Sequence, residues 1–493
     1  MADGQRSAPA GPSPADTCNP WEDAGRLATL PRVLGPFDAV TVVIGSIIGS
    51  GIFLKVDTIA RHMGSFGPIV AVWVVGGLAA LCGSLALAEL AAMLPRAGGP
   101  YVYLRHAYGR LTAFLWGWTE FSIIRTGSLG SLACGTVIYF NRFLESVESQ
   151  GMLPPRLAEL VPISHLGQGL LTVVSVVCLC SINIAGTRWA AWTQNVTTIF
   201  KLSFLGLLMA APLLLGQARV ENLRPIGPAG WGLDFWRAFG LALVAVFWPY
   251  DGWPNIGPVA EEIRHPQRNV PLALGTGMLT VIGVYVAANF GYHLALPMER
   301  VQQTQAIAAD VMGALWGRWG VTIAALGVMI STFGALNANI LAGPRVYFAV
   351  ARDGLLPKAL RQVHARFRTP ANAIASQGAW SLLQIVVVFA LLENPKQAFD
   401  RLTDFVILGG AVFYGLTVAA VFVLRYRLPD LERPYRTWGY PVTPLLYLLS
   451  VGAVIGSIAL SNLWQVAAAA GLLLGGTGVY RFFCAVESRN PAR

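Results

Sequence analysis

Long apolar stretches separated by short polar connections dominate the pattern along the chain. Runs of span length occupy residues 37–62, 67–94, 111–141, 166–185, 189–215, 235–262, 270–296, 320–350, 371–392, 403–425, 440–461 and 464–485. A helix of roughly 20 mainly apolar residues crosses the hydrocarbon core of a bilayer, and it pairs its own backbone polar groups. The pattern therefore predicts an all-α integral membrane protein with about twelve transmembrane helices.

Two stretches depart from this pattern. Val301–Trp319 is helical in period but less apolar, so it is predicted to be a helix outside the bilayer or a re-entrant lid and not a further crossing. Residues 1–35 are rich in Ala, Pro, Ser and Gly, and they lack the basic stretch and apolar core of a signal peptide. They are predicted to form a disordered cytoplasmic tail.

Composition and charge agree with a membrane protein. Only 12% of residues are charged, whereas soluble domains carry about 25%. The net charge of +10 comes from basic residues in short connections, above all in Arg352–Arg368. Such connections face the cytoplasm, so both termini are predicted to be cytoplasmic in a multi-pass protein of the cell membrane. The sequence contains no basic patch with interleaved aromatic residues, so nucleic-acid binding is not predicted.

Residues that carry catalysis or bind metals are not grouped in the sequence. The six cysteines are scattered, and Cys178 and Cys180 lack a usual metal-ligand spacing. The six histidines lie mostly in loops, and neither Gly-x-Ser-x-Gly nor His-Glu-x-x-His occurs. We therefore predict no catalytic residues, no metal, no cofactor and no enzyme activity; an intramembrane enzyme or a receptor is the least favoured function class.

Two of the apolar runs are interrupted at mid-membrane depth. The first contains Gly45–Phe53 (GSIIGSGIF), with three glycines that each weaken a helix by about 1 kcal/mol relative to alanine. A packing face of small residues explains Gly45 and Gly49 but not Gly51. The sixth contains Val246–Pro258 (VFWPYDGWPNIGP), whose three prolines exclude a continuous helix; the alternative is one kinked helix.

Interruptions in the first and sixth spans are typical of transporters built from an inverted repeat. Where a helix stops, orphan carbonyls attract a cation, and the amides that open the next half-helix attract an anion. A zwitterionic amino acid carries one group of each kind. Amides at Gly49, Ser50 and Gly51 are predicted to bind its carboxylate, and carbonyls near Ile47 and Trp248 its ammonium group.

The motifs resemble those of the amino acid–polyamine–organocation superfamily, and within it the L-type (light-chain) amino acid transporters. The resemblance covers residues from about 33 to 485. Its marks follow in order: Gly45–Phe53, Asp251–Trp253 with Glu261 and Glu262, Pro266–Pro271, Ser331–Gly334 and Arg433–Pro441.

The resemblance implies a LeuT-like fold of five-plus-five inverted repeats, with discontinuous helices 1 and 6 and two extra C-terminal helices. Its expected parts are repeat 1 at residues 36–215, repeat 2 at 234–425, two final spans at 440–485 and a cytoplasmic C-terminus at 486–493.

Lys201 lies about 18 Å from either end of the fifth run, beyond the reach of either interface. A structural polar network is one interpretation. The resemblance implies another, in which the ammonium occupies the place of a sodium ion and bridges the first broken helix to Ser331 and Thr332. A proton carrier is the third.

Other candidate residues carry alternatives of their own. Asp251 either caps the following half-helix or is a counter-ion for cationic substrates. Trp248 is either an aromatic gate, as the resemblance implies, or a packing residue; Pro249 and Pro254 depart from the family pattern beside it. Glu120 and Arg125 are expected to pair in a polar network. The predicted substrate-binding set is Ile47, Gly49, Ser50, Gly51, Ile52, Trp248, Tyr250, Asp251 and Trp253.

The sequence thus predicts a sodium-independent exchanger of neutral L-amino acids that works by alternating access. The alternative is a proton-coupled symporter of amino acids or polyamines. In animal members of the family that this sequence resembles, a cysteine between spans three and four forms a disulfide bond with a heavy chain. The corresponding loop, residues 141–165, has no cysteine, so no disulfide-linked heavy chain is expected.

Overall fold

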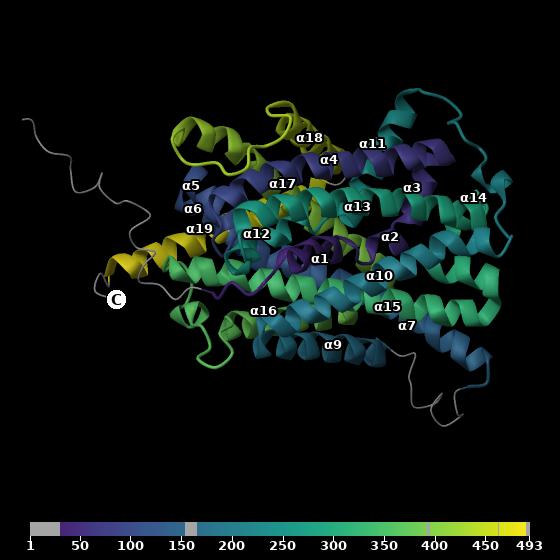
Figure 1. Ribbon diagram of the computed structural model, residues 1–493, viewed down its shortest axis with the longest axis horizontal. Helices are drawn as coiled ribbons and strands as arrows, with labels where there is room; N and C mark the ends of the chain where they lie inside the picture. The colour runs from purple at the N-terminus through teal and green to yellow at the C-terminus, as the bar shows by residue number, and fades with distance from the viewer. Residues whose placement is uncertain (1–29, 153–164, 392–394, 462, 490–493) are drawn as a thin grey trace, which may run out of the picture.

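The computed structural model describes residues 30–152, 165–391, 395–461 and 463–489. These residues form helices and connections, with one isolated bridge between Leu34 and Ile263. Within them, nine helical segments are long and apolar enough to cross a membrane. Most of the long helices run along the longest axis of the molecule (Figure 1). The prediction of an all-α integral membrane protein is confirmed.

All twelve predicted runs are helical over most of their length. The first run is divided among α1 (Pro36–Ile47), α2 (Gly51–Leu54) and α3 (Val56–Met63). The sixth comprises α11 (Leu233–Tyr250), a 3₁₀ turn (Trp253–Asn255), α12 (Ile256–Val259) and a second 3₁₀ turn (Ala260–Glu262). The other long helices are α4 (Phe66–Met93), α6 (Arg110–Thr119) continued by a π-helical turn (Glu120–Ile124) and α7 (Arg125–Ser149), α9 (His165–Ala185), α10 (Thr187–Leu214), α13 (Pro266–Ala295), α15 (Ile307–Arg352), α16 (Ala371–Leu391), α17 (Pro395–Arg427), α18 (Val442–Ser461) and α19 (Leu463–Arg489).

The less apolar stretch before the eighth span, predicted to be one helix or a re-entrant lid, forms separate helical pieces. Helix α14 spans Met298–Gln303, and α15 starts at Ile307 but breaks at Gly317, where φ is +59°. A residue with a side chain rarely adopts that conformation, and glycine does so without a steric penalty. The residues from Ile307 to Trp316 therefore form a helix that is separate from the span that follows.

Two features at one end of the bundle were not predicted. Helix α5 (Pro100–Tyr108) follows α4, but its nine residues are too few for a span. Residues 30–35, assigned to the disordered tail, are instead held in place: Leu34 N–H donates to Glu262 O at 3.0 Å, and Arg264 N–H donates to Leu34 O at 2.8 Å. The rest of the predicted tail (residues 1–29) and residues 490–493 of the C-terminus lie outside the described residues.

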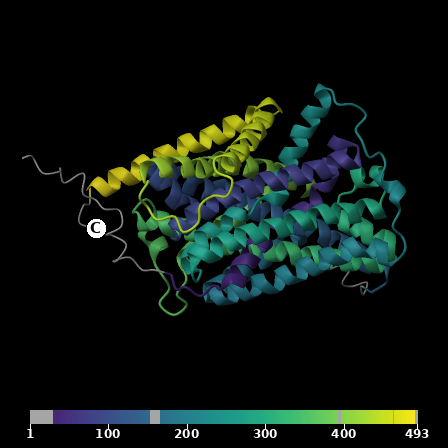
Figure 2. The ribbon, with the colours of Figure 1, turned by 45° about the horizontal axis from the view of Figure 1, so that its top comes forward.

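The two interrupted helices lie inside the bundle. Helix α1 packs against α10, α13 and α15, and the short α2 contacts α11 and α15. Helices α18 and α19 lie at its outside (Figure 2). The described start of the chain, the end of α19 and the segment Arg352–Arg368 share one end of the molecule (Figure 1), called here the basic end. The division into two repeats stays a prediction.

Candidate functional site

The first interruption leaves backbone groups without helical partners in the middle of the bundle. Helix α1 ends at Ile47 and α2 begins at Gly51. Among the described residues, no acceptor is found for the backbone amides of Gly49, Ser50 and Gly51. All three residues lie beside an internal cavity. Unpaired amides at a helix start attract negative charge, so this wall of the cavity suits a carboxylate.

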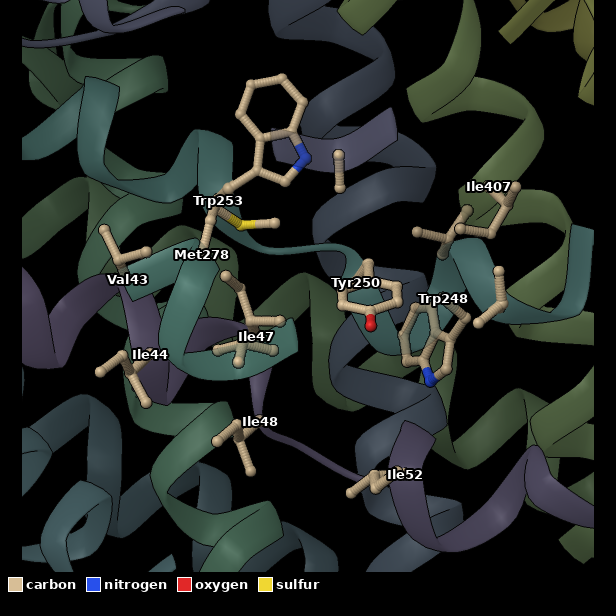
Figure 3. Close-up of a cluster of buried hydrophobic side chains, with 14 of the residues drawn as sticks. Val43, Ile44, Ile47, Ile48, Ile52, Trp248, Tyr250, Trp253, Met278 and Ile407 are labelled. Atoms are coloured by element: carbon tan, nitrogen blue, oxygen red, sulfur yellow. The ribbon is translucent and has the colours of Figure 1, made fainter. Parts of the chain in front are cut away.

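The second interruption meets the first at very short range. Helix α11 ends at Tyr250, and Asp251 and Gly252 connect it to the next turn. A Cβ atom on Gly51 would lie 2.6 Å from Pro249 Cα, and one on Gly252 would lie 2.6 Å from Ser46 O. Side chains larger than hydrogen would separate the two breaks. Figure 3 shows Ile47, Ile48 and Ile52 on the first interrupted helix, with Trp248 and Tyr250 on the second.

Six of the nine predicted substrate-binding residues line the cavity between the breaks. They are Ile47, Gly49, Ser50, Gly51, Trp248 and Asp251. Tyr250 and Trp253 lie instead beside a smaller neighbouring cavity, which Asp251 also lines. Tyr250 donates to Trp73 O at 2.9 Å, and Trp253 packs on the rings of Tyr414 and Tyr447.

Ile52 is fully buried in the hydrophobic core and does not line the cavity. Ile52 lies within the helix α2, beyond the break, whereas the predicted residues that line the cavity on this segment lie at or before the start of α2.

Each of the two predicted carbonyl acceptors already accepts one hydrogen bond. Ile47 O accepts a hydrogen bond from the Tyr285 hydroxyl at 3.1 Å, and Trp248 O accepts one from Asp251 N–H at 3.1 Å. A carbonyl oxygen has two lone pairs. Either one can therefore still accept a hydrogen bond from an ammonium group in the cavity.

Lys201 forms hydrogen bonds with the end of the first half-helix, α1. It is fully buried on α10, and its Nζ donates to Gly45 O at 2.8 Å and to Ile48 O at 2.6 Å. These carbonyls belong to the last turn of α1, where a helix carries partial negative charge. The ammonium thus satisfies orphan carbonyls that the interruption creates.

The direct bridge from Lys201 to Ser331 and Thr332 is not formed. Ser331 donates to Gly49 O at 3.2 Å, and the Thr332 hydroxyl pairs with Thr136 on α7 at 2.7 Å. The ammonium is already engaged by two carbonyls at short distance. Helix α15 therefore contacts the break through Ser331, one residue beyond the carbonyls that Lys201 holds.

Arg125 also lines the cavity, although it was not among the predicted site residues. The expected ion pair with Glu120 forms, and both side chains are buried. Its Nη1 atom also donates to Asn255 Oδ1 at 2.9 Å and to Asn339 Oδ1 at 2.6 Å. Ionisable residues inside membrane spans mark functional sites by default, and that rule applied to Arg125 would have identified it.

The Asp251 carboxylate faces the same cavity. Tyr414 on α17 lines the cavity as well. Gly252 follows with φ of +118° and precedes the turn Trp253–Asn255. Both predicted roles of Asp251, as a cap and as a counter-ion for a cationic substrate, stay predictions.

Tyr285 on α13 joins the two interrupted helices through one hydroxyl group. It approaches Ile47 O at 3.1 Å and Pro249 O at 3.0 Å. We expect Tyr285→Phe, which removes only this oxygen, to reduce substrate exchange about three- to tenfold, because a neutral hydrogen bond contributes about 0.5–1.5 kcal/mol. Initial rates of exchange in reconstituted vesicles measure the effect.

A matched control lies on the same helix. Tyr292 is also fully buried, but its hydroxyl makes no hydrogen bond to any described residue. Tyr292→Phe should leave exchange unchanged. Equal rates for the two variants would contradict a role for the Tyr285 hydroxyl in joining the breaks.

Ion pairs close the molecule on both sides of the cavity. At the basic end, Arg345 binds Glu262 at 2.7 Å with both side chains fully buried, and Arg352 binds Glu261 at 3.1 Å. The opposite end is closed by four charged residues and two rings. Lys55 binds Asp400 at 2.8 Å, Lys396 binds Asp57 at 3.2 Å, and Phe399 packs on Trp248 with ring centroids 6.0 Å apart.

The enclosed cavity has a volume of about 30 Å³, enough for roughly two water molecules. Ion pairs and packed rings therefore lie on both sides of a cavity that is too small for an amino acid in this conformation.

The chain is similar to amino acid permeases, among them amino acid transporters and exchangers. A family model for amino acid permeases matches residues 34–476. The chain is 30% identical to the serine/threonine exchanger SteT of Bacillus subtilis (strain 168), over 92% of this chain and 96% of the relative. It is 27% identical to the human b(0,+)-type amino acid transporter 1 (93% and 89% covered) and 28% identical to the human Asc-type amino acid transporter 1 (95% and 85% covered).

Proposed function

Because the chain belongs to the amino acid permease family, we propose that it is a sodium-independent exchanger of small neutral L-amino acids that works by alternating access. The observation that carries the proposal is the meeting of two interrupted helices at a closed cavity. Its lining includes Gly49, Ser50 and Gly51, whose amides have no acceptor among the described residues, together with Ile47 and Trp248, which supply carbonyl acceptors. Such a cavity complements the carboxylate and ammonium groups that every amino acid shares.

Neutral side chains fit the charges around the cavity best. Asp251 would attract a cationic side chain, but Arg125 would repel it. For an anionic side chain, Arg125 would attract and Asp251 would repel. A small hydroxyl side chain can instead bond to the polar wall formed by Ser128, Asn255 and Asn339. The name of the Bacillus relative, a serine/threonine exchanger, supports this preference.

Lys201 supports independence from sodium. Its ammonium already supplies a positive charge to the carbonyls at the end of α1, where a bound cation would otherwise be stabilised. The basic end is assigned to the cytoplasm by the positive-inside rule. Both termini are then cytoplasmic, and the chain functions as a transporter and not as an enzyme. Residues 153–164 of the loop without cysteine lie outside the described residues, and we propose that no disulfide-linked heavy chain is needed.

The test uses the full chain, purified alone and reconstituted in liposomes without sodium. Vesicles are loaded with unlabelled serine or left empty, and uptake of labelled serine, alanine, leucine and arginine is followed. We expect uptake into loaded vesicles to exceed that into empty ones at least about tenfold, with serine and alanine ahead of leucine and arginine. Adding sodium should change nothing.

Other outcomes would overturn parts of the proposal. Equal uptake into empty vesicles that grows with an inward proton gradient would indicate a proton symporter. Preference for arginine would make Asp251 a counter-ion for cationic substrates. Activity that appears only with a disulfide-linked second chain would contradict independence from a heavy chain.

A further inference from the structure

A second cavity, separate from the one between the breaks, lies at the basic end. Its volume is about 420 Å³, which is ample for an organic ligand. Four arginines line it: Arg32 before α1, Arg96 after α4, Arg105 on α5 and Arg352 at the end of α15. The carboxylates in its wall are Glu261 and Asp353. Among the described residues, the lining therefore contains two more arginines than carboxylates.

Both carboxylates are already held by donors from the protein. Glu261 accepts hydrogen bonds from Arg352 at 3.1 Å and from the amides of Leu30 and Ala97 at 2.8 Å each. Asp353 binds Arg105 at 2.6 Å and accepts a bond from the Tyr101 hydroxyl. Both carboxylates are thus engaged by these donors.

Two ionisable residues of the lining, Arg96 and His106, have lowered pKa values. Burial lowers the pKa of Arg96, and the neighbouring charges of Arg352 and Arg105 lower it further, against the opposing effects of Glu261 and Asp353. Burial also lowers the pKa of His106, as do Arg105 and Arg96. Burial is the largest cause of both shifts and disfavours a charge of either sign. The preference for an anion therefore rests on the four arginines of the lining and not on these shifts.

We propose that this cavity binds a phosphate-bearing anion. Guanidinium groups match phosphate oxygens through paired hydrogen bonds, and basic pockets at the cytoplasmic side of membrane proteins suit anionic head groups. The phosphate belongs either to a lipid head group or to a soluble phosphate compound. This assignment does not depend on which amino acid the protein carries.

Binding there has a mechanical consequence. The arginines come from four segments, and two of them, the residues before α1 and the end of α15, also hold the closed basic end through Glu261. An anion that joins these segments resists their separation. The occupied cavity therefore favours the state that is closed at the basic end and slows exchange.

The first arm of the test uses soluble phosphate. Inorganic pyrophosphate is titrated into the full-length protein in neutral detergent at constant ionic strength, and the melting temperature is followed. We expect pyrophosphate to raise the melting temperature of the unmodified protein. The double variant Arg32→Gln/Arg96→Gln should bind it at least about tenfold more weakly, because each hydrogen bond to a charged group contributes substantially to the free energy of binding. The matched control is Arg268→Gln/Arg366→Gln, which removes two exposed arginines outside the cavity.

The second arm uses nanodiscs of phosphatidylcholine with or without phosphatidylglycerol and the same variants. Stabilisation by phosphatidylglycerol alone, lost in the double variant, identifies a lipid head group. Stabilisation by pyrophosphate alone identifies a soluble ligand. Absence of both effects, or equal loss in the control variant, overturns the proposal. If the double variant does not fold, Arg32→Gln alone provides the test, since Arg32 is exposed.

Discussion

Replacing Lys201 with methionine is expected to reduce exchange at least about 100-fold while leaving the protein folded. Methionine keeps most of the volume of the side chain but donates nothing to Gly45 O and Ile48 O, which the ammonium reaches at 2.8 and 2.6 Å. A hydrogen bond to a charged group contributes about 1.5–3 kcal/mol. Loss of two such bonds frees the end of α1, and about 2.7 kcal/mol already corresponds to a 100-fold change in rate.

Stability should respond much less than activity. No carboxylate of the described residues pairs with Lys201, so its removal also relieves the desolvation of an unpaired charge. We expect a melting temperature within a few degrees of that of the unmodified protein. Exchange of labelled serine and thermal unfolding are measured on the same preparation, with Lys358→Met, an exposed lysine at the basic end, as control.

Two results would assign Lys201 another role. Exchange within about twofold of normal would make it a packing residue that happens to reach two carbonyls. Loss of uptake driven by a proton gradient, with exchange between loaded vesicles retained, would make it a proton carrier. The experiment thus separates the three interpretations that the sequence leaves open.

The positions of the two interruptions were predictable because their causes are local. Prolines remove backbone donors and glycines weaken helices wherever they stand, so the sequence placed the breaks within a few residues of Ile48–Ser50 and Asp251–Gly252. Lys201 was predictable for a similar reason, since a charge far from either interface requires a partner.

The rest of the cavity wall depends on long-range packing. Asn339 and Tyr414 lie on α15 and α17, where an apolar pattern on every side does not show which face of a helix points inward. The bonds of Thr332 to Thr136 and of Arg125 to Asn255 likewise join residues far apart in the chain. Tyr250 and Trp253 were placed in the site because of their position in the motif, but both lie beside a neighbouring cavity.

The closeness of the two breaks leads to a second large effect, for Gly252→Ala. The alanine Cβ would lie 2.6 Å from Ser46 O and 3.0 Å from Ile47 N, and φ at this position is +118°. Overpacking costs about 1–3 kcal/mol and a strained backbone a further 1–3 kcal/mol or so. Because the obstructing atoms belong to the backbone of α1, relief requires the two interrupted helices to move apart. We expect exchange to fall at least about 100-fold and the melting temperature to fall with it.

The matched control for Gly252→Ala is Gly206→Ala on α10, where a Cβ meets nothing within 4 Å. That substitution should leave exchange intact and stabilise the helix by up to about 1 kcal/mol. Binding of serine, measured as its stabilisation of each variant against heat, separates misfolding from a damaged site. A Gly252→Ala protein that is stable, binds serine and exchanges it normally would show that the two breaks need not touch. The amides and carbonyls of the cavity would then have to bind an amino acid from helices that stand further apart.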